Sequence, residues 1–213
     1  MIVALYCIII FSLGIALRLL IKGQSGPFYL VHFVLLSCFI DLTAGILGWF
    51  GKNNSLIYNF FMIVEYLYWI LFFISIFLNH PFKKIIAFTG VLGIIFSLYR
   101  VFNHNLMVFD TVMHTAISVG ILIFVLLYFY HTLLLEVPHA LETDPVFFLS
   151  AGLLFMYAGG LIFFNSLDYV MKLNKDFARK LYVIIPLLNT LLYMSYIAAM
   201  LCTLSWKKRR LSS

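Results

Sequence analysis

The chain has 213 residues, of which 64% are hydrophobic and only 10% are charged, and its formal net charge is +6. This composition excludes an ordinary soluble domain, whose surface needs far more charged side chains. It also gives no support for nucleic-acid binding, because the basic residues lie in connections and in the tail, where membrane topology and contact with anionic lipid explain them better.

Seven apolar stretches follow one another along the chain, and a helix of about 20 mostly apolar residues is enough to cross a bilayer. They comprise residues 1–17, 28–50, 56–78, 85–101, 110–130, 145–167 and 181–206. We therefore predict an all-α integral membrane protein in which residues 1–206 form a single domain, a bundle of seven transmembrane helices. Residues 207–213 form a short basic tail.

Turn-forming residues, a proline and the cysteines add detail to this prediction. Gly, Asn, Ser and Pro cluster at residues 23–27 and 51–55, which predicts two tight connections. Pro186 lies inside the seventh stretch and removes a backbone donor, so we predict a kink there. The cysteines lie in separate apolar stretches and fit no disulfide framework or common metal pattern, and they are Cys7, Cys38 and Cys202.

Lysine and arginine counts predict the orientation of the bundle. The first residues carry neither, whereas residues 207–210 are all basic, so we expect the N-terminus outside and the C-terminus in the cytoplasm. The basic residues Arg18, Lys22 and 83–84 agree with this orientation. The basic connection 172–180 disagrees with it, because it would lie outside.

Two acidic residues, Asp41 and Glu65, fall near the middle of the second and third stretches. An ionisable group at the bilayer centre costs several kcal/mol, so it is retained where it pairs, meets water or takes part in function. With the N-terminus outside, the other polar residues fall in the outer halves of the spans and the inner halves are nearly all apolar. We therefore predict an outward-facing polar pocket, and its candidate ligand-binding residues are Asp41, Tyr58, Asn59, Glu65, Arg100, Asp110, His114 and Asn165.

A purely structural polar network is the main alternative to a pocket. Arg100 can pair with Asp110 or Asp168 simply to satisfy buried charges. The i,i+4 spacing of Asp110, His114 and Ser118 also permits a hydrogen-bonded triad, although nothing in the sequence supplies an oxyanion hole or a nucleophile elbow.

Two further hypotheses use the same acids. A metal, if there is one, would be held by Asp41, Glu65, Asp110 and His114, an oxygen-rich set with one imidazole, but no HExxH element supports it. A proton relay through Asp41 and Glu65 would need a path through the membrane, and the apolar inner halves argue against one. We predict no cofactor, and retinal is disfavoured because residues 181–206 contain no lysine for a Schiff base.

Two segments carry a family resemblance. Residues 54–66, NSLIYNFFMIVEY, and residues 147–164, with Ser-Ala-Gly at 150–152 and Tyr-Ala-Gly-Gly at 157–160, resemble small uncharacterised seven-helix proteins of Bacteroidota. The resemblance covers about half the chain. It implies an integral protein of the bacterial inner (cytoplasmic) membrane and no particular activity.

These observations favour a non-enzymatic membrane protein, either a sensor or receptor-like protein that binds a small ligand or lipid, or a membrane subunit of a signalling or transport assembly. The expected partners are membrane lipid and a membrane or cytoplasmic protein. One alternative is an intramembrane metal-dependent lipid hydrolase, and another is a purely structural membrane subunit.

Overall fold

The computed structural model describes residues 2–23, 29–134, 141–173 and 180–210. Residues 174–179 of the basic connection and residues 211–213 of the tail lie outside this part, so the predictions about them are not addressed. The side chains of residues 204–210 are likewise not described.

Seven long helices make up most of the described chain, with one short 3-10 helix, η2 (Leu141–Thr143). Each long helix is apolar enough to cross a membrane, and no strand occurs among the described residues. The prediction of an all-α fold with seven helices long and apolar enough to span a membrane is thereby confirmed among the described residues, whereas the orientation stays a prediction. The long helices are α1 (Ile2–Ile21), α2 (Leu30–Trp49), α3 (Ser55–Ile76), α4 (Phe82–Asn103), α5 (Thr111–Leu134), α6 (Pro145–Leu173) and α8 (Ile184–Arg210).

Two helix bounds differ from those expected from hydropathy. Helix α1 continues to Ile21, beyond the predicted end at residue 17, because Arg18 is a good helix former and interacts favourably with the C-terminal end of the helix dipole. Helix α8 begins at Ile184, after a turn at residues 182–183. Pro186 therefore lies in the first turn of α8, where its missing N–H needs no partner, and the seventh stretch is interrupted by the turn at residues 182–183, about one turn before the proline.

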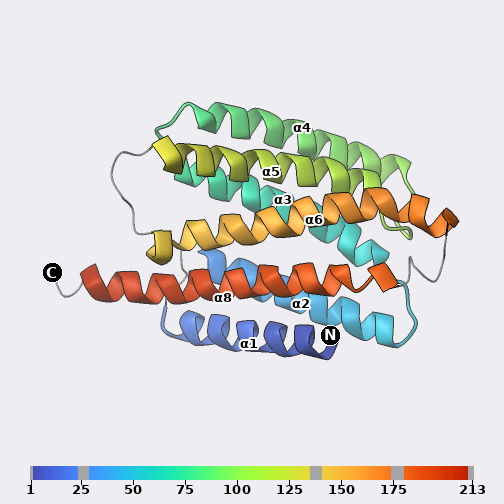
Figure 1. Cartoon of the computed structure of the whole chain (residues 1–213), viewed down its shortest axis with the longest axis horizontal. Coiled ribbons are helices and arrows are strands. Elements are labelled where there is room, and N and C mark those ends of the chain that lie inside the picture. The colour runs from blue at the N-terminus through green and yellow to red at the C-terminus, as the bar shows by residue number, and fades with distance from the viewer. Residues whose placement is uncertain (1, 24–28, 135–140, 174–179, 211–213) are drawn as a thin grey trace.

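The helices pack side by side in an order that leaves a space at their centre. Helix α3 packs against α4 and α5, α5 against α6, and α6 against α8. Helix α1 then connects α8 to α2, and a contact between α2 and α3 closes the ring. In Figure 1, α1 and α4 lie at opposite edges of the bundle, and α1 begins and α8 ends at opposite ends.

Glycines allow close approach at three of these contacts, between α1 and α2, between α3 and α4, and between α3 and α5. Gly45 of α2 lies directly against the Tyr6 side chain of α1. Gly93 of α4 and Gly120 of α5 both face the ring of Tyr66, whose hydroxyl donates a hydrogen bond to a backbone oxygen of α4. Small residues at such positions are how membrane helices pack closely without a hydrophobic driving force.

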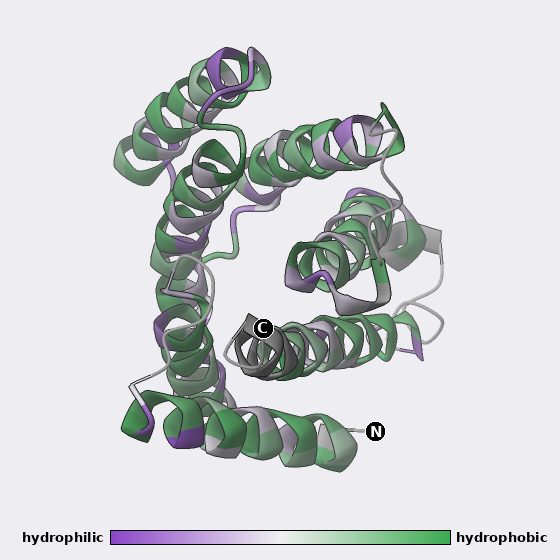
Figure 2. Cartoon of the chain, turned by 90° about the vertical axis from the view of Figure 1, so that its left-hand side faces the viewer, coloured by the Kyte–Doolittle hydropathy of each residue, from purple (hydrophilic) through white to green (hydrophobic). Residues whose placement is uncertain are grey.

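Large apolar side chains cover the outside of the bundle. Phe11 of α1 and Phe88 of α4, for example, are 62% and 66% exposed. Figure 2 shows that hydrophobic residues predominate along the helices. Such a surface suits contact with lipid chains and would be a liability in water.

Candidate functional site

A cavity of about 620 Å³ occupies the space between α2, α3, α5, α6 and α8. Its polar lining comprises Ser37, Asp41, Asn54, Ser55, Tyr58, Glu65, Thr111, His114, Tyr157, Tyr182, Asn189, Tyr193 and Tyr196. Its apolar lining comprises Phe61, Met62, Val108, Phe109, Ile117, Met156, Phe164, Leu167, Ile185, Pro186 and Leu192. This size and mixture are typical of small-molecule sites, which are mainly apolar with a few polar groups.

The cavity extends from one end of the bundle to its middle. Ser55 and Thr111, the first residues of α3 and α5, line the cavity at that end of the bundle. Glu65 lies ten residues into α3, about 15 Å from that end at 1.5 Å per residue. The 22-residue length of α3 puts Glu65 near the midpoint of the span, and Asp41 holds a similar position in the 20-residue α2, as the sequence predicted.

Asp41 is held by tyrosines. The hydroxyl of Tyr193 in α8 donates a hydrogen bond of 2.7 Å to Asp41 Oδ2, and the hydroxyl of Tyr58 also faces this carboxyl. The bond joins α2 to α8 at the wall of the cavity. Asp41 therefore both lines the cavity and supports its wall.

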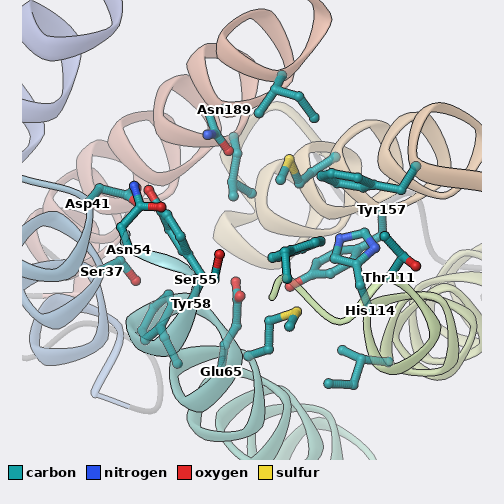
Figure 3. Close-up of a pocket in the computed structure, with 18 of the residues that line it drawn as sticks. Ser37, Asp41, Asn54, Ser55, Tyr58, Glu65, Thr111, His114, Tyr157 and Asn189 are labelled. Atoms are coloured by element: carbon teal, nitrogen blue, oxygen red, sulfur yellow. The ribbon is translucent and has the colours of Figure 1, made fainter. Parts of the chain in front are cut away.

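Glu65 is less completely partnered. The groups that face its carboxyl are the hydroxyl of Tyr157 in α6 and the indole N–H of Trp69, one turn further along α3. Both groups are hydrogen-bond donors, which is the kind of partner that a carboxylate requires. The Trp69 nitrogen nevertheless has no hydrogen-bond partner among the described residues. In Figure 3 the Glu65 side chain extends from α3 into the open space.

Two buried hydroxyl groups of the cavity wall also lack partners. Ser37 and Tyr196 are 4% and 1% exposed, and neither hydroxyl oxygen makes a hydrogen bond in the described part of the chain. Most buried polar groups in proteins are hydrogen-bonded to protein or to ordered water.

Arg100 and Asp110 form a second polar region, at the connection between α4 and α5. The guanidinium donates two hydrogen bonds, of 2.8 and 2.9 Å, to the two carboxyl oxygens of Asp110. Asp110 Oδ1 also accepts the backbone N–H groups of Val112 and Met113, so it caps the start of α5. Burial by itself raises the pKa of this carboxyl, but Arg100 and the Met113 N–H outweigh burial and hold the pKa below its usual value.

Asn59 belongs to the same region. Its amide nitrogen donates to the backbone oxygens of Leu106 and Val108, at 3.0 and 2.9 Å. Its amide oxygen accepts the backbone N–H of Asp110 at 3.1 Å. We call Asn59, Arg100 and Asp110 the α4–α5 network. It fastens this connection to α3.

The structure therefore separates the eight predicted ligand-binding residues. Asp41, Tyr58, Glu65 and His114 line the cavity. The three residues of the α4–α5 network are used to hold the fold, as the structural alternative proposed. Asn165 is exposed on α6, where its amide bonds to Thr115 at 3.1 Å, and it does not line the cavity.

His114 lies on the α5 side of the cavity, across from Asp41 (Figure 3). The rings of Phe109 and Phe164 flank it, with centroids 5.8 and 4.6 Å from its own. Its Nδ1 is 3.4 Å from the hydroxyl of Ser118. Because the Asp110 carboxylate pairs with Arg100 instead, the structure does not assemble the triad that the i,i+4 spacing permitted.

The four residues considered as metal ligands do not come together in the structure either. Within the described ranges, no three His, Cys, Asp or Glu side chains lie close enough together to hold an ion. Asp110 belongs to the α4–α5 network and does not line the cavity with the other three.

Several cavity residues lay outside the predicted set. The most informative are Asn189, Tyr193 and Tyr196, which share one face of α8 at i,i+4 and i,i+7 spacing. A stripe of amide and phenol groups on an otherwise apolar helix was visible in the sequence. It signalled a polar interior, but not which acid each tyrosine would reach.

No protein-family model, curated protein or solved structure matches the chain. The resemblance to Bacteroidota membrane proteins therefore stays a prediction. Function is argued from the geometry of the cavity alone.

Proposed function

We propose that this membrane protein binds a small, partly apolar ligand in the cavity between α2, α3, α5, α6 and α8, as a receptor-like protein or a binding subunit. The observation that carries the proposal is the combination of space and unmet bonding capacity. A cavity of about 620 Å³ contains one incompletely partnered carboxyl, Glu65, and polar side chains that include Ser55, Thr111 and Asn189. Groups of this kind orient a ligand in a mainly apolar site.

The ligand enters, in this proposal, at the bundle end where α3 and α5 begin. Asn54, Ser55 and Thr111 line the cavity at that end, and their short polar side chains suit a mouth that meets water. In the orientation that we propose from the lysine and arginine counts, this is the outer end. A membrane or cytoplasmic protein partner would then receive the signal or the ligand.

The two alternative functions have weaker support. A metal-dependent lipid hydrolase needs metal ligands close together, and Asp110 is bonded to Arg100 at a distance of 2.8 Å instead of joining Asp41 and Glu65 at the cavity. A purely structural subunit explains the α4–α5 network well. It does not explain why polar groups beside the cavity lack hydrogen-bond partners.

The proposal can be tested by blocking the mouth of the cavity. Ser55→Trp puts a large ring at the mouth, and Ser166→Trp is the matched control because Ser166 is exposed on α6 and does not line the cavity. Wild type and both variants are purified in nanodiscs, and the small molecules that they retain are extracted and identified by mass spectrometry.

We expect wild type and Ser166→Trp to retain the same molecule, and Ser55→Trp to retain at least fivefold less of it. Circular dichroism and size-exclusion profiles establish that the three proteins are folded. Equal amounts of every extracted molecule in all three proteins would contradict the proposal.

A further inference from the structure

The charge of the cavity is opposite to that of the chain. The whole sequence carries a formal net charge of +6. Yet, among the described residues, the cavity lining contains two carboxyl groups, Asp41 and Glu65, and no lysine or arginine. Arg100, the basic residue in the last turn of α4, is already bonded to Asp110. An anionic ligand would find no lysine or arginine in this lining and only the single imidazole of His114, whereas a cation would find two acids.

The hydrogen-bonding groups fit a cation that carries N–H donors. An ammonium group has three donors and no acceptor. Glu65 offers a carboxyl that extends into the space, and the side-chain oxygens of Ser55 and Asn189, which also line the cavity, can accept. Asp41 differs, because the Tyr193 hydroxyl already bonds to it at 2.7 Å. Glu65 is therefore the better counter-ion of the two.

Aromatic rings surround the same acids. Tyr58 and Phe61 of α3, Tyr157 of α6, and Tyr193 and Tyr196 of α8 all line the cavity. A cation over the face of such rings is attracted by their electrons, and the attraction is stronger where water is excluded. Tyrosines also accept or donate hydrogen bonds at their outer ends, so they suit the polar end of a mixed ligand.

The rest of the lining is apolar and leaves room for more than a headgroup. Met62, Ile117, Met156 and Leu192 form much of the wall, and about 620 Å³ is far more than an ammonium group occupies. We propose that the cavity binds an organic cation, with its ammonium group at Glu65 and an apolar body among these side chains. This inference rests on the proposed ligand-binding function and adds the chemical class of the ligand.

The ammonium group can belong to a free amine or to the headgroup of phosphatidylethanolamine. In the phospholipid a phosphate lies next to the ammonium group. The described lining offers no lysine or arginine to that phosphate, which favours a free amine. The experiment separates the two sources by changing the lipid.

Three probes with one skeleton test the inference: phenylbutylamine, phenylbutanol and phenylbutyrate, which present a cation, a neutral hydroxyl and an anion. Each is dialysed to equilibrium against the whole protein in phosphatidylglycerol nanodiscs, and binding to empty nanodiscs is subtracted. Glu65→Gln removes the proposed counter-ion with little change of shape. Asp144→Asn is the matched control, since it also replaces a carboxyl by an amide, and Asp144 accepts a hydrogen bond from the Tyr128 hydroxyl and does not line the cavity.

We expect wild type and Asp144→Asn to bind the amine at least tenfold more tightly than the alcohol, because charge-assisted hydrogen bonds are about twice as strong as neutral ones. Glu65→Gln should bind both about equally, with its affinity for the alcohol unchanged. Weaker amine binding in phosphatidylethanolamine nanodiscs supports the ammonium chemistry and identifies the lipid headgroup as its source. Unchanged binding there supports a free amine.

Two results would overturn the inference, and they have different consequences. If the alcohol or the carboxylate binds as tightly as the amine, the cation assignment is wrong while ligand binding stands. If none of the three probes binds above empty nanodiscs, both the cation assignment and the ligand-binding function are contradicted.

Discussion

The α4–α5 network and the cavity acids solve the same physical problem in different ways. Asp110 has a guanidinium and two backbone N–H groups as partners, and its side chain is 3% exposed. Two hydrogen-bond donors, from Tyr157 and Trp69, face the Glu65 carboxyl. It has no charged partner in the cavity lining, and there is open space beside it. Both arrangements place a carboxyl among apolar helices, where charge is costly. A fully partnered carboxyl stabilises the fold, whereas an incompletely partnered one is available to a ligand.

The largest effect should follow from removing the cation of the α4–α5 network. Arg100→Ala leaves the Asp110 carboxylate buried without its charged partner, and we expect a loss of about 3 kcal/mol in the free energy of unfolding. Denaturant titration in detergent micelles measures it. Asp41→Asn is the comparison, and it should cost less because Tyr193 can still bond to the amide oxygen. A smaller loss for Arg100→Ala than for Asp41→Asn would reverse the comparison.

The same network makes a smaller, pH-dependent contribution. Asp110→Asn keeps an oxygen for the helix cap but loses the charge pair, so we expect a loss of about 2 kcal/mol at pH 7. Because the pKa of Asp110 is lowered in the folded protein, its stabilising effect is complete above the unfolded pKa of about 4 and is lost as pH falls through the folded pKa.

Unfolding of wild type and Asp110→Asn between pH 3 and pH 7 measures this contribution. The difference between the two proteins should shrink below about pH 4. Thr190→Val is a control, since it removes an uncharged hydroxyl that bonds to Pro186 O, and its difference from wild type should not follow the same curve. A pH-independent difference for Asp110→Asn would show that the charge pair contributes little.

Tyr193→Phe tests whether the cavity wall needs the hydrogen bond between Tyr193 and Asp41. The substitution removes the donor to Asp41, and we expect a loss of about 1 kcal/mol. Tyr196→Phe is a matched control from the same face of α8, because its hydroxyl has no partner in the described chain and its removal should change stability by less than about 0.5 kcal/mol. Equal losses in the two variants would mean that the Tyr193 bond adds nothing.

Much of the fold follows from the sequence because hydropathy acts locally. Seven apolar stretches separated by turns were enough to predict seven helices, and Asp41 and Glu65 fell at mid-span by counting residues. The ends were less predictable. Helix α1 continues past Arg18, and α8 starts after Leu181. Hydropathy does not report capping or helix dipoles, which help to set where a helix begins and ends.

The site was only partly predictable, because the depth of a residue in its helix does not determine which neighbouring helix its side chain faces. Asn59 immediately follows Tyr58, yet Asn59 bonds to the α4–α5 connection while Tyr58 lines the cavity. The pairing of Arg100 with Asp110 was one of two open alternatives and depended on how α4 meets α5. Such choices are set by contacts between helices, which one sequence does not contain.

The smallest effect on stability should come from Glu65, the residue to which we assign the ammonium group of the ligand. Glu65→Gln keeps the size of the side chain and removes a carboxyl that has no ion-pair partner, so we expect the free energy of unfolding to change by less than about 0.5 kcal/mol in the ligand-free protein. Denaturant titration alongside Arg100→Ala measures it. A loss as large as that of Arg100→Ala would place Glu65 with Asp110 as a stabilising residue. Unchanged stability with a lost preference for amines would separate the two regions, because only the cavity acid would then be dispensable for folding and required for binding.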